Sequence, residues 1–550
     1  MRKRVTPWAG AALAAAVVVG TAACGAGASS PGGASGGSGK NGGTITIDSG
    51  TAPLSADPAL DFTTQGNELY SVVDTPLLTF KRGVAGSAGS QIIPGLATSV
   101  PKPTNGGKTY TFQLRSGLKY SNGQAIKASD VAYALERDLK VPWQAASFIS
   151  GYVKGGTAYA NGKAKSISGI TTDDSKGTVT VNLNQPFAPI VDIFALPATS
   201  PVPQSTPMKN LASTGTIGDG PYKWGSISPN HTYTLVKNTK FDVPGMSKGH
   251  ADKIVYSVNS NVEANAQAVQ NNQADVFDPG DTLPSSVLQD VKQDSDRYKA
   301  VPTNSSWYFW FGVNQKPFNN LYARQAVQAA LDDRALSRLD SGFMQEDCHL
   351  IPTGIIGHSS PSSCPFHNAD GAPNMAKAKA LMKKSGMTGQ KVTVYGEERS
   401  PRKQYLDYYT QVLNQIGFKA TEKVVNSSVY FTTIGAPSLK PQTGFGDWSQ
   451  DFPNPWDFMN LFAGNAGSTL NYGYVNDKHY NSTLQTLFQK PPQSVASQWA
   501  ALDQYAVNKG YYAAYGHEEY PQFYSNRLVF TPNAFSVEYL TDLTALQLKS

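Results

Sequence analysis

The stretch GDWSQDFPNPW (residues 446–456) brings four acid or amide side chains, two indole rings and two prolines into one short segment. Each proline fixes its own φ angle and disfavours helix in the residue before it, so an extended, rigid loop is predicted. Loops that hold bulky aromatic side chains beside a carboxylate are typical of binding sites. A surface turn whose tryptophans reach back into the core is the alternative, and the surrounding sequence has to decide.

The size and composition of the chain indicate a protein with several domains. Its 550 residues are enough for two or three domains, each with its own core. Hydrophobic residues make up 40% and charged residues 16%, which is ordinary for a soluble protein. The formal net charge is +6, and no basic stripe gathers the cations, so we expect no nucleic-acid partner.

The N-terminus has the features of an export signal. A positively charged start precedes the apolar run 9–20, which is too short to span a bilayer, and small residues then lead to Cys24. This arrangement resembles a bacterial lipoprotein signal, although Thr21 stands where an aliphatic residue is usual. We predict a signal peptide over residues 1–23 and a lipidated Cys24 that anchors the protein at the extracytoplasmic face of the cell membrane. The Gly-, Ala- and Ser-rich residues 24–43 are predicted to form a flexible tether.

Two further cysteines, Cys348 and Cys364, remain in the chain. In an exported protein a single remaining pair most simply forms a disulfide, and a loop of this length contributes about 3 kcal/mol in the chain-entropy model. His349, His358 and His367 lie nearby in the sequence, but no C-x-x-C or H-x-x-x-H spacing supports a metal site. We therefore expect neither a metal nor another cofactor.

Two segments show the order strand, helix, strand. In the first, an alternating strand at 253–258 is followed by a helix at 262–271 and a short buried strand at 274–277. In the second, strands at 392–395 and 418–424 flank another helix. This order implies parallel strands joined by a right-handed crossover. Two such units indicate two lobes, and ligands usually bind in the cleft at such a boundary.

Several short motifs stand in a fixed order along the chain. They are Asp57-Pro58, YTFQLRSGLKYSNG at 110–123 with ASDV at 128–131, GPY at 220–222, Asn314 with Phe318, RQA at 324–326, LDDR at 331–334 and WSQDFPNP at 448–455. No single motif is specific, but their order behind a lipoprotein leader is. Together they resemble the family 5 substrate-binding proteins of ABC importers, which include peptide- and oligopeptide-binding lipoproteins.

The resemblance implies an α/β (mixed α+β) chain with a two-lobed, periplasmic-binding-protein-like type II fold. An extra inserted domain is expected, and the ligand cleft lies between the lobes, which close by a hinge motion. The expected parts are a discontinuous lobe I at 44–65, 200–303 and 515–550, a small inserted α+β domain at 66–199, and lobe II at 304–514.

The resemblance also implies a ligand site around Asp451, the acid that in peptide-binding members anchors the α-ammonium of the ligand. Trp448 in the same motif is expected to line the cleft. Gln450 stands where a small residue is usual and is expected to narrow or re-polarise the site, and Asn454 replaces a common second Asp. Asp447 receives no role.

Arg399 and Arg402 are the candidates for binding a ligand carboxylate, because they follow the predicted strand at 392–395. Solvation of the protein surface is the alternative role for each arginine, and the more common one for such residues.

The resemblance implies a monomeric, lipid-anchored receptor that binds oligopeptides or dipeptides and delivers them to an ABC permease complex in the membrane. A receptor for another small solute, such as an oligosaccharide, an opine or a metal chelate, is the alternative. An extracellular hydrolase is a third hypothesis, but the chain has no H-E-x-x-H or P-loop motif. The closest match, HEEY at 517–520, lacks the second histidine. We therefore expect no enzymatic activity.

Overall fold

The computed structural model describes most of the chain after the N-terminal region. The described residues are 39–84, 88–141, 143, 145–366, 372–436, 438–464, 470–531, 534–536 and 538–550. The predicted signal peptide, Cys24, most of the predicted tether and His367 lie outside them. The described residues all belong to one unit, Gly37–Ser550.

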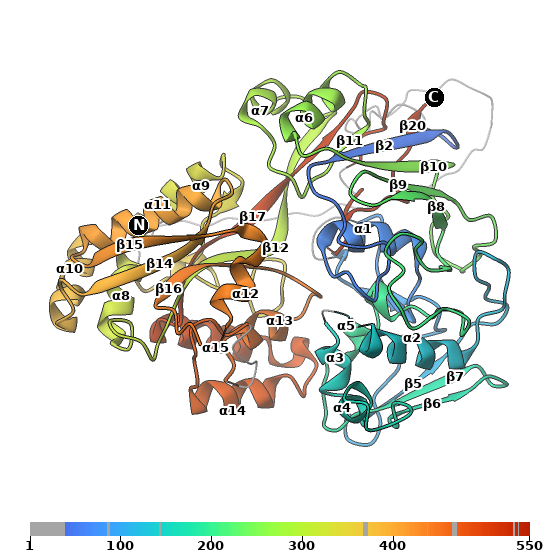
Figure 1. The fold of residues 1–550 in the computed structure, drawn as a ribbon, viewed down its shortest axis with the longest axis horizontal. Helices are drawn as coiled ribbons and strands as arrows, with labels where there is room; N and C mark the ends of the chain where they lie inside the picture. The colour runs from blue at the N-terminus through green and yellow to red at the C-terminus, as the bar shows by residue number, and fades with distance from the viewer. Residues whose placement is uncertain are drawn as a thin grey trace, which may run out of the picture. The chain divides into compact units, whose positions relative to one another are not determined.

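An 11-stranded sheet organises the described chain (Figure 1). Two long antiparallel neighbours, β12 and β17, stand in the middle of the strand order, with β16, β14 and β15 beyond β12 and β11, β2, β10, β9 and β8 beyond β17. The remaining strand, β13, pairs with β17. The bounds are β2 (Thr44–Ser49), β8 (Tyr222–Ser228), β9 (Thr232–Lys237), β10 (Lys253–Val258), β11 (Val276–Phe277), β12 (Tyr298–Phe311), β13 (Met344–Gln345), β14 (Lys391–Glu397), β15 (Lys419–Val425), β16 (Thr443–Ser449) and β17 (Tyr512–Tyr524).

Both predicted strand–helix–strand units are confirmed. In the first unit, α6 (Val262–Gln270) links β10 and β11, and both strands pair parallel with β2. In the second unit, α11 (Arg402–Gln415) links β14 and β15, which pair parallel with each other. Apolar alternation in the strands and an apolar stripe on each helix are local signals, so the sequence was sufficient to find both units.

A smaller sheet lies within the residues predicted as the inserted domain. Its order is β5 (Thr109–Gln113), β7 (Thr178–Asn182) and β6 (Ile170–Asp173), and α2 (Ala128–Lys140) packs on β6 and β7. Arg137 of α2 is buried and donates two hydrogen bonds to the buried carboxylate of Asp57, at 2.8 and 2.6 Å. This ion pair ties the small sheet and its helix to the chain before it. The exact boundaries of the three predicted parts stay a prediction.

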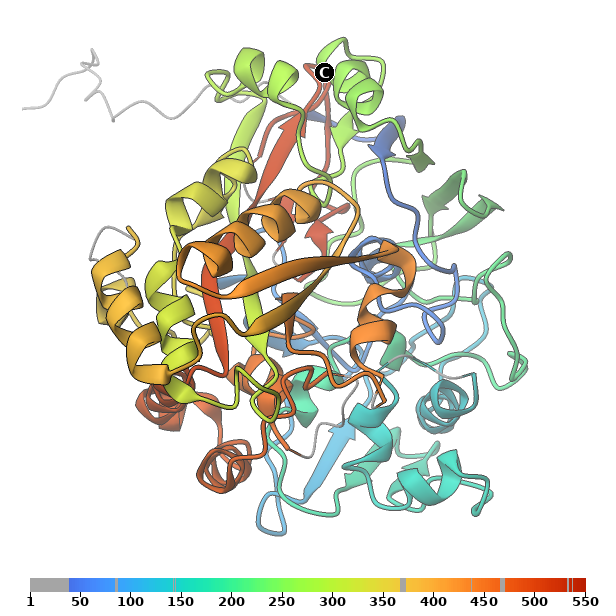
Figure 2. The same ribbon diagram turned by 60° about the vertical axis from the view of Figure 1, so that its left-hand side comes forward.

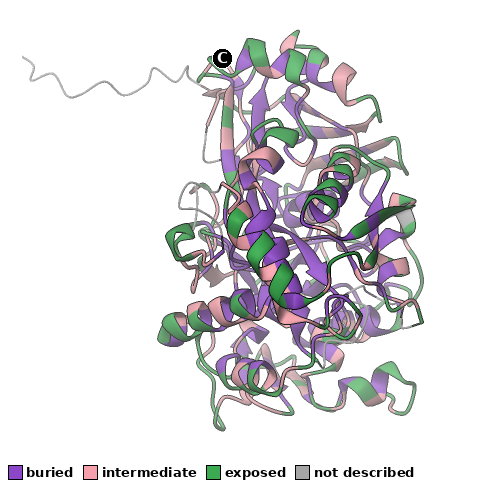
Figure 3. Ribbon diagram, turned by 90° about the vertical axis from the view of Figure 1, so that its left-hand side faces the viewer, coloured by how far each residue is buried: buried purple, intermediate pink, exposed green. Residues whose placement is uncertain are grey.

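The remaining helices pack on the sheets (Figure 2). Helix α11 lies on β14, β15 and β16, and α9 and α15 lie on β17. The outward faces of the helices are exposed, whereas the strands behind them are buried (Figure 3). None of the helices within the described ranges is both long and apolar enough to cross a bilayer. The other helices are α1 (Thr64–Val73), α3 (Ser147–Ser150), α4 (Gly156–Ala160), α5 (Ile190–Ile193), α7 (Ser285–Val291), α8 (Leu321–Ala330), α9 (Asp333–Leu339), α10 (Met375–Ser385), α12 (Tyr430–Ile434), α13 (Pro455–Met459), α14 (Lys478–Leu487) and α15 (Ala496–Lys509), with short 3-10 turns at Pro197–Thr199, Pro361–Ser363, Ser427–Val429, Asn460–Phe462 and Pro492–Val495.

Short strand pairs complete the structure, and one of them corrects the predicted tether. The pairs are β3 (Leu78–Phe80) with β4 (Ile92–Pro94), β18 (Phe535–Ser536) with β19 (Leu540–Thr541), and β1 (Gly39–Lys40) with β20 (Leu548–Lys549). Because β1 pairs with the C-terminal strand, the predicted tether ends before Gly39 rather than at residue 43. Backbone hydrogen bonds form this pair, so the glycine-rich composition does not reveal it.

The prediction that residues 446–456 form one extended loop is wrong in part. Residues 446–449 are the end of β16, paired with β12, and α13 begins at Pro455. Only residues 450–454 are a loop. Proline is favourable at the first position of a helix, where its missing N–H would have no partner, so here it starts a helix rather than preventing one.

Candidate functional site

A cavity lies where β12 and β16 stop pairing, next to the predicted ligand site. It encloses about 570 Å³ free of protein atoms, including space open to solvent. Each of the expected parts of the chain contributes to its wall. The lining residues are Thr64, Asn67, Phe80, Leu196, Pro197, Thr303, Asn304, Ser305, Ser449, Gln450, Asp451, Tyr520, Phe535, Glu538, Tyr539 and Leu540.

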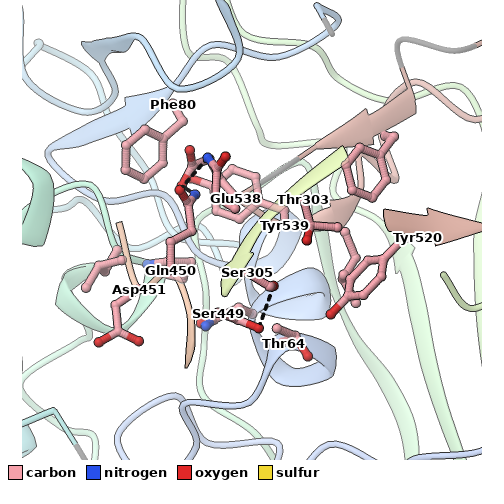
Figure 4. A pocket seen from close by; sticks show the side chains of 16 residues that line it. Thr64, Phe80, Thr303, Ser305, Ser449, Gln450, Asp451, Tyr520, Glu538 and Tyr539 are labelled. Carbon is pink, nitrogen blue, oxygen red and sulfur yellow. Dashed lines mark hydrogen bonds between the residues drawn. The ribbon is translucent and has the colours of Figure 1, made fainter. Parts of the chain in front are cut away.

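Gln450 crosses this cavity and connects separate parts of its wall (Figure 4). Its side-chain amide donates to Oε2 of Glu538 at 2.6 Å, and its side-chain oxygen accepts from Asn304 at 2.6 Å. The last rung of the β12–β16 pairing lies just before it, where the hydroxyls of Ser305 and Ser449 are 2.8 Å apart. Gln450 therefore occupies space that a small residue would leave open.

Asp451 is half-buried at the edge of the cavity, and its carboxylate points away from the Gln450 amide (Figure 4). Its backbone N–H donates to Oδ2 of Asp457 at 2.7 Å. Burial and then the negative charge of Asp457 raise the pKa of Asp451 well above its usual range, and burial raises the pKa of Asp457 to about 7. Among the described residues, no cation lowers the pKa of Asp451. A cationic group of a ligand would supply the missing countercharge.

Two other acids near the cavity were missed by the sequence analysis. Burial raises the pKa of Glu538 to about 8 and the pKa of Asp192 to about 7, and the charge of Asp457 adds to both. Neither acid lies in a motif near Asp451, so no local signal points to it. Asp457 could have been found, because it follows Asp451 closely in the sequence. Four carboxyl groups in one region favour a ligand with a positive charge.

Asn454, one of the two departures from the family motif, has a structural role here. Its side-chain oxygen accepts from the N–H of Trp456 at 3.1 Å and caps α13, while its side-chain nitrogen donates to Asp192 at 3.0 Å. An aspartate could cap the helix equally well but would place a further negative charge beside Asp192. The substitution thus reduces repulsion between acids beneath the cavity.

Trp448 does not line this cavity in the described structure. It precedes Ser449 in β16, and successive side chains of a strand point to opposite faces of the sheet. Ser449 faces the cavity, whereas Trp448 is half-buried and packs against the main apolar cluster. The predicted role of Trp448 in contacting a ligand stays a prediction.

Arg402 differs from both roles considered for it, because its side chain is largely buried in an ion-pair network. Its guanidinium donates to the carboxylates of Glu397 and Asp447 and lies over the rings of Trp307 and Phe445. Burial lowers the pKa of Arg402, but the charges of Asp447 and Glu397 outweigh burial and raise it. The two carboxylates together balance the charge of Arg402. Asp447, which received no role in the sequence analysis, is thus an ion-pair partner of Arg402.

Arg399 retains the exposed position expected of a surface arginine. Its side chain is 55% exposed and forms an ion pair with Oε2 of Glu397 at 3.1 Å. It is not among the described residues that line the cavity. Its predicted contact with a ligand carboxylate is therefore left as a prediction.

One edge of β16 has no neighbouring strand beside the cavity among the described residues. Strand β12 pairs with β16 as far as Ser449, whereas β14 pairs with it only at Thr443 and Gly444. Residues 445–449 therefore have one edge that no described strand occupies. An extended chain can join such an edge through main-chain hydrogen bonds.

Comparisons with known proteins agree with this architecture. Dipeptide-binding protein DppE of Bacillus subtilis (strain 168) is 26% identical over 394 residues, which cover 69% of this chain and 70% of that protein. Oligopeptide-binding protein OppA of the same strain is 23% identical over 476 residues, covering 82% and 84%. The solved structure of clavulanic acid biosynthesis oligopeptide binding protein 2 superposes with a TM-score of 0.83 at 21% identity, covering 94% of this chain and 97% of that one.

The structural likeness confirms the predicted α/β, two-lobed fold of the periplasmic-binding-protein type. The family model "Bacterial extracellular solute-binding proteins, family 5 Middle" matches residues 91–469, which is well over half of the chain. This protein therefore belongs to the bacterial extracellular solute-binding proteins, family 5.

Proposed function

We propose that this protein is the peptide receptor of an ABC importer and that the carboxylate of Asp451 binds the α-ammonium of its ligand. The observation that carries the proposal is the half-buried Asp451 beside Asp457, with no described cation to balance its charge. Burial strengthens the attraction between a carboxylate and an ammonium, provided that both partners are present. The similarity to dipeptide- and oligopeptide-binding proteins supports peptides over other solutes.

The main chain of the peptide would bind along residues 446–449, on the edge that no described strand occupies. Strand addition gives affinity without reading side chains, which suits a receptor for peptides of varied sequence. Gln450 would limit the room near the ligand, because it fills the space between Asn304 and Glu538. Arg399, with its exposed side chain, is the remaining candidate for the ligand carboxylate.

The receptor would act outside the cytoplasm as a monomer without enzymatic activity, held to the membrane by a lipid on Cys24 and delivering peptides to a permease. The export signal predicted before Cys24 supports this location. Replacing the cysteine in Cys24→Ala should release the protein from the membrane fraction, as measured by fractionation and immunoblotting. Unchanged retention in the membrane would exclude the lipid on Cys24 as the anchor.

Two measurements test the cargo. Mass spectrometry of the denatured protein should detect peptides that co-purify with it. A thermal-shift screen should then show stabilisation by peptides with a free amino terminus, because a ligand at about 100 times its Kd adds about 2.7 kcal/mol. N-acetylated peptides of the same sequence should stabilise much less. Stabilisation by oligosaccharides or metal chelates, and not by peptides, would contradict the proposal.

A further inference from the structure

A cluster of metal-ligating side chains lies apart from the acids around Asp451. Asp347 and His358 come from the chain around the disulfide Cys348–Cys364, and His517 comes from β17. Oδ2 of Asp347 lies 3.5 Å from Nε2 of His517 and 3.7 Å from Nε2 of His358. The ligand atoms of all three residues lie within 4.8 Å of one another.

Hydrogen bonds on the far side of each ring determine which nitrogen faces the cluster. Nδ1 of His358 lies 2.8 Å from the carbonyl oxygen of Ile351, which can only accept, so Nδ1 carries the proton. Nδ1 of His517 lies 3.0 Å from the hydroxyl of Ser306, and that hydroxyl donates its own proton to the carbonyl of Leu350 at 2.6 Å. Both neutral rings therefore direct the lone pair of Nε2 at Asp347.

Asp347 is oriented in the same way. Its Oδ1 accepts from the backbone N–H of His349 at 2.9 Å and lies 2.8 Å from Nδ1 of the same histidine. Oδ2 is left facing the two Nε2 atoms. A hydrogen-bonded ligand with one free lone pair is the arrangement that proteins use to hold metal-binding side chains.

This cluster leaves buried polar atoms without partners among the described residues. The side chains of Asp347 and His517 are only 1% and 2% exposed, yet Oδ2 of Asp347 and Nε2 of His517 have no hydrogen bond. Their separation of 3.5 Å is longer than the usual 2.7–2.9 Å of a charge-assisted hydrogen bond. A tetrahedral zinc ion with bonds of about 2.0–2.2 Å places its ligand atoms about 3.3–3.6 Å apart, close to the distances of 3.5 and 3.7 Å seen here.

We propose that Asp347, His358 and His517 bind one divalent cation of the zinc type. Two imidazoles and a carboxylate form a common ligand set for zinc, and a water molecule would complete a tetrahedron. The site is closed on the side of Asp347 and His517, while the 18% exposure of the His358 side chain provides a way in. No spacing signal points to this site, because His517 is remote from the other two residues in the chain.

The cation would hold the segment around the disulfide against β17, next to the ligand cavity. A Cβ added at Gly354 would lie 2.1 Å from Oδ1 of Asn304, so this segment packs directly on a residue that lines the cavity. The proposed site does not depend on the identity of the solute. It predicts that bound metal stabilises this wall of the cavity whether or not the ligand is a peptide.

The test uses the full chain with its disulfide intact, freed of metal with a chelator and dialysed against zinc. We expect one zinc ion per chain by elemental analysis and a rise in Tm that the chelator reverses. His358→Gln, at the exposed rim of the site, should weaken zinc binding by about 100-fold or more, and so should His517→Gln. His479→Gln, which changes an exposed histidine elsewhere, should bind zinc like the wild type.

Replacing zinc by cobalt distinguishes this site from a site formed by cysteine thiolates. Tetrahedral cobalt bound by nitrogen and oxygen should give visible absorption bands without a thiolate charge-transfer band. Circular dichroism of His358→Gln and His517→Gln checks that each variant is folded. Absence of one-to-one binding, equal binding by folded His358→Gln, or binding that appears only after Cys348 and Cys364 are reduced would each overturn the proposal.

Discussion

Replacing Asp451 by asparagine keeps the shape of the side chain and removes its charge. Truncating one partner of a desolvated charge pair usually costs about 2–5 kcal/mol in affinity. The loss should lie in the lower part of that range, because burial and the charge of Asp457 raise the pKa of Asp451 and so disfavour the charged form that pairs with an ammonium. We therefore expect a loss of about 2–3 kcal/mol at pH 7, or about 30- to 150-fold in Kd.

A thermodynamic cycle isolates this interaction. The affinities of one peptide and its N-acetylated form are measured by calorimetry for the wild type and for Asp451→Asn. Acetylation of the peptide should weaken its binding to the wild type by about 2–3 kcal/mol and its binding to the variant by much less. The coupling energy is the difference between these two losses. Asp242→Asn, which changes an exposed carboxylate, is the matched control. A coupling energy below about 0.5 kcal/mol would show that Asp451 does not bind the ammonium.

Three further predictions concern stability. Because the pKa of Glu538 is raised from 4.5 to about 8, its carboxyl should make the free energy of unfolding fall as the pH rises through this window, and Glu538→Gln should flatten that slope in urea titrations without ligand. Arg137→Met and Asp57→Asn should each lower the free energy of unfolding by about 3–5 kcal/mol. The double variant should be far less destabilised than the sum of the two single losses, and additive losses would refute the coupling. Replacing both Cys348 and Cys364 by alanine should cost about 3 kcal/mol, and mass spectrometry that finds free thiols in the wild type would contradict this.

Local patterns in the sequence were enough to predict parts of the architecture, whereas the type II fold and the inserted domain were implied by the resemblance to a family. Alternation and helical periodicity identified both strand–helix–strand units, since burial of one face depends on neighbours close in the chain. The stretch at 446–456 was predicted to be a binding segment, and its local conformation was misjudged, because pairing with β12 extends the strand through residues 446–449. Pro455 was expected to keep the chain extended, but it stands at the first position of α13, where proline is favourable.

The electrostatics of the site were decided by the tertiary structure alone. The motif identified Asp451 as a candidate, but its raised pKa depends on burial and on how close the folded chain places Asp457 to it. The order of strands in the sheet places Asp447 beside Arg402, and folding brings Glu538 to Gln450, 88 residues away in the chain. Periodicity describes which face of an element is buried and says nothing about which distant charges meet there. The motif thus predicted where a ligand would bind, and the folded chain brings together the acids from which we propose that the ligand carries a positive charge.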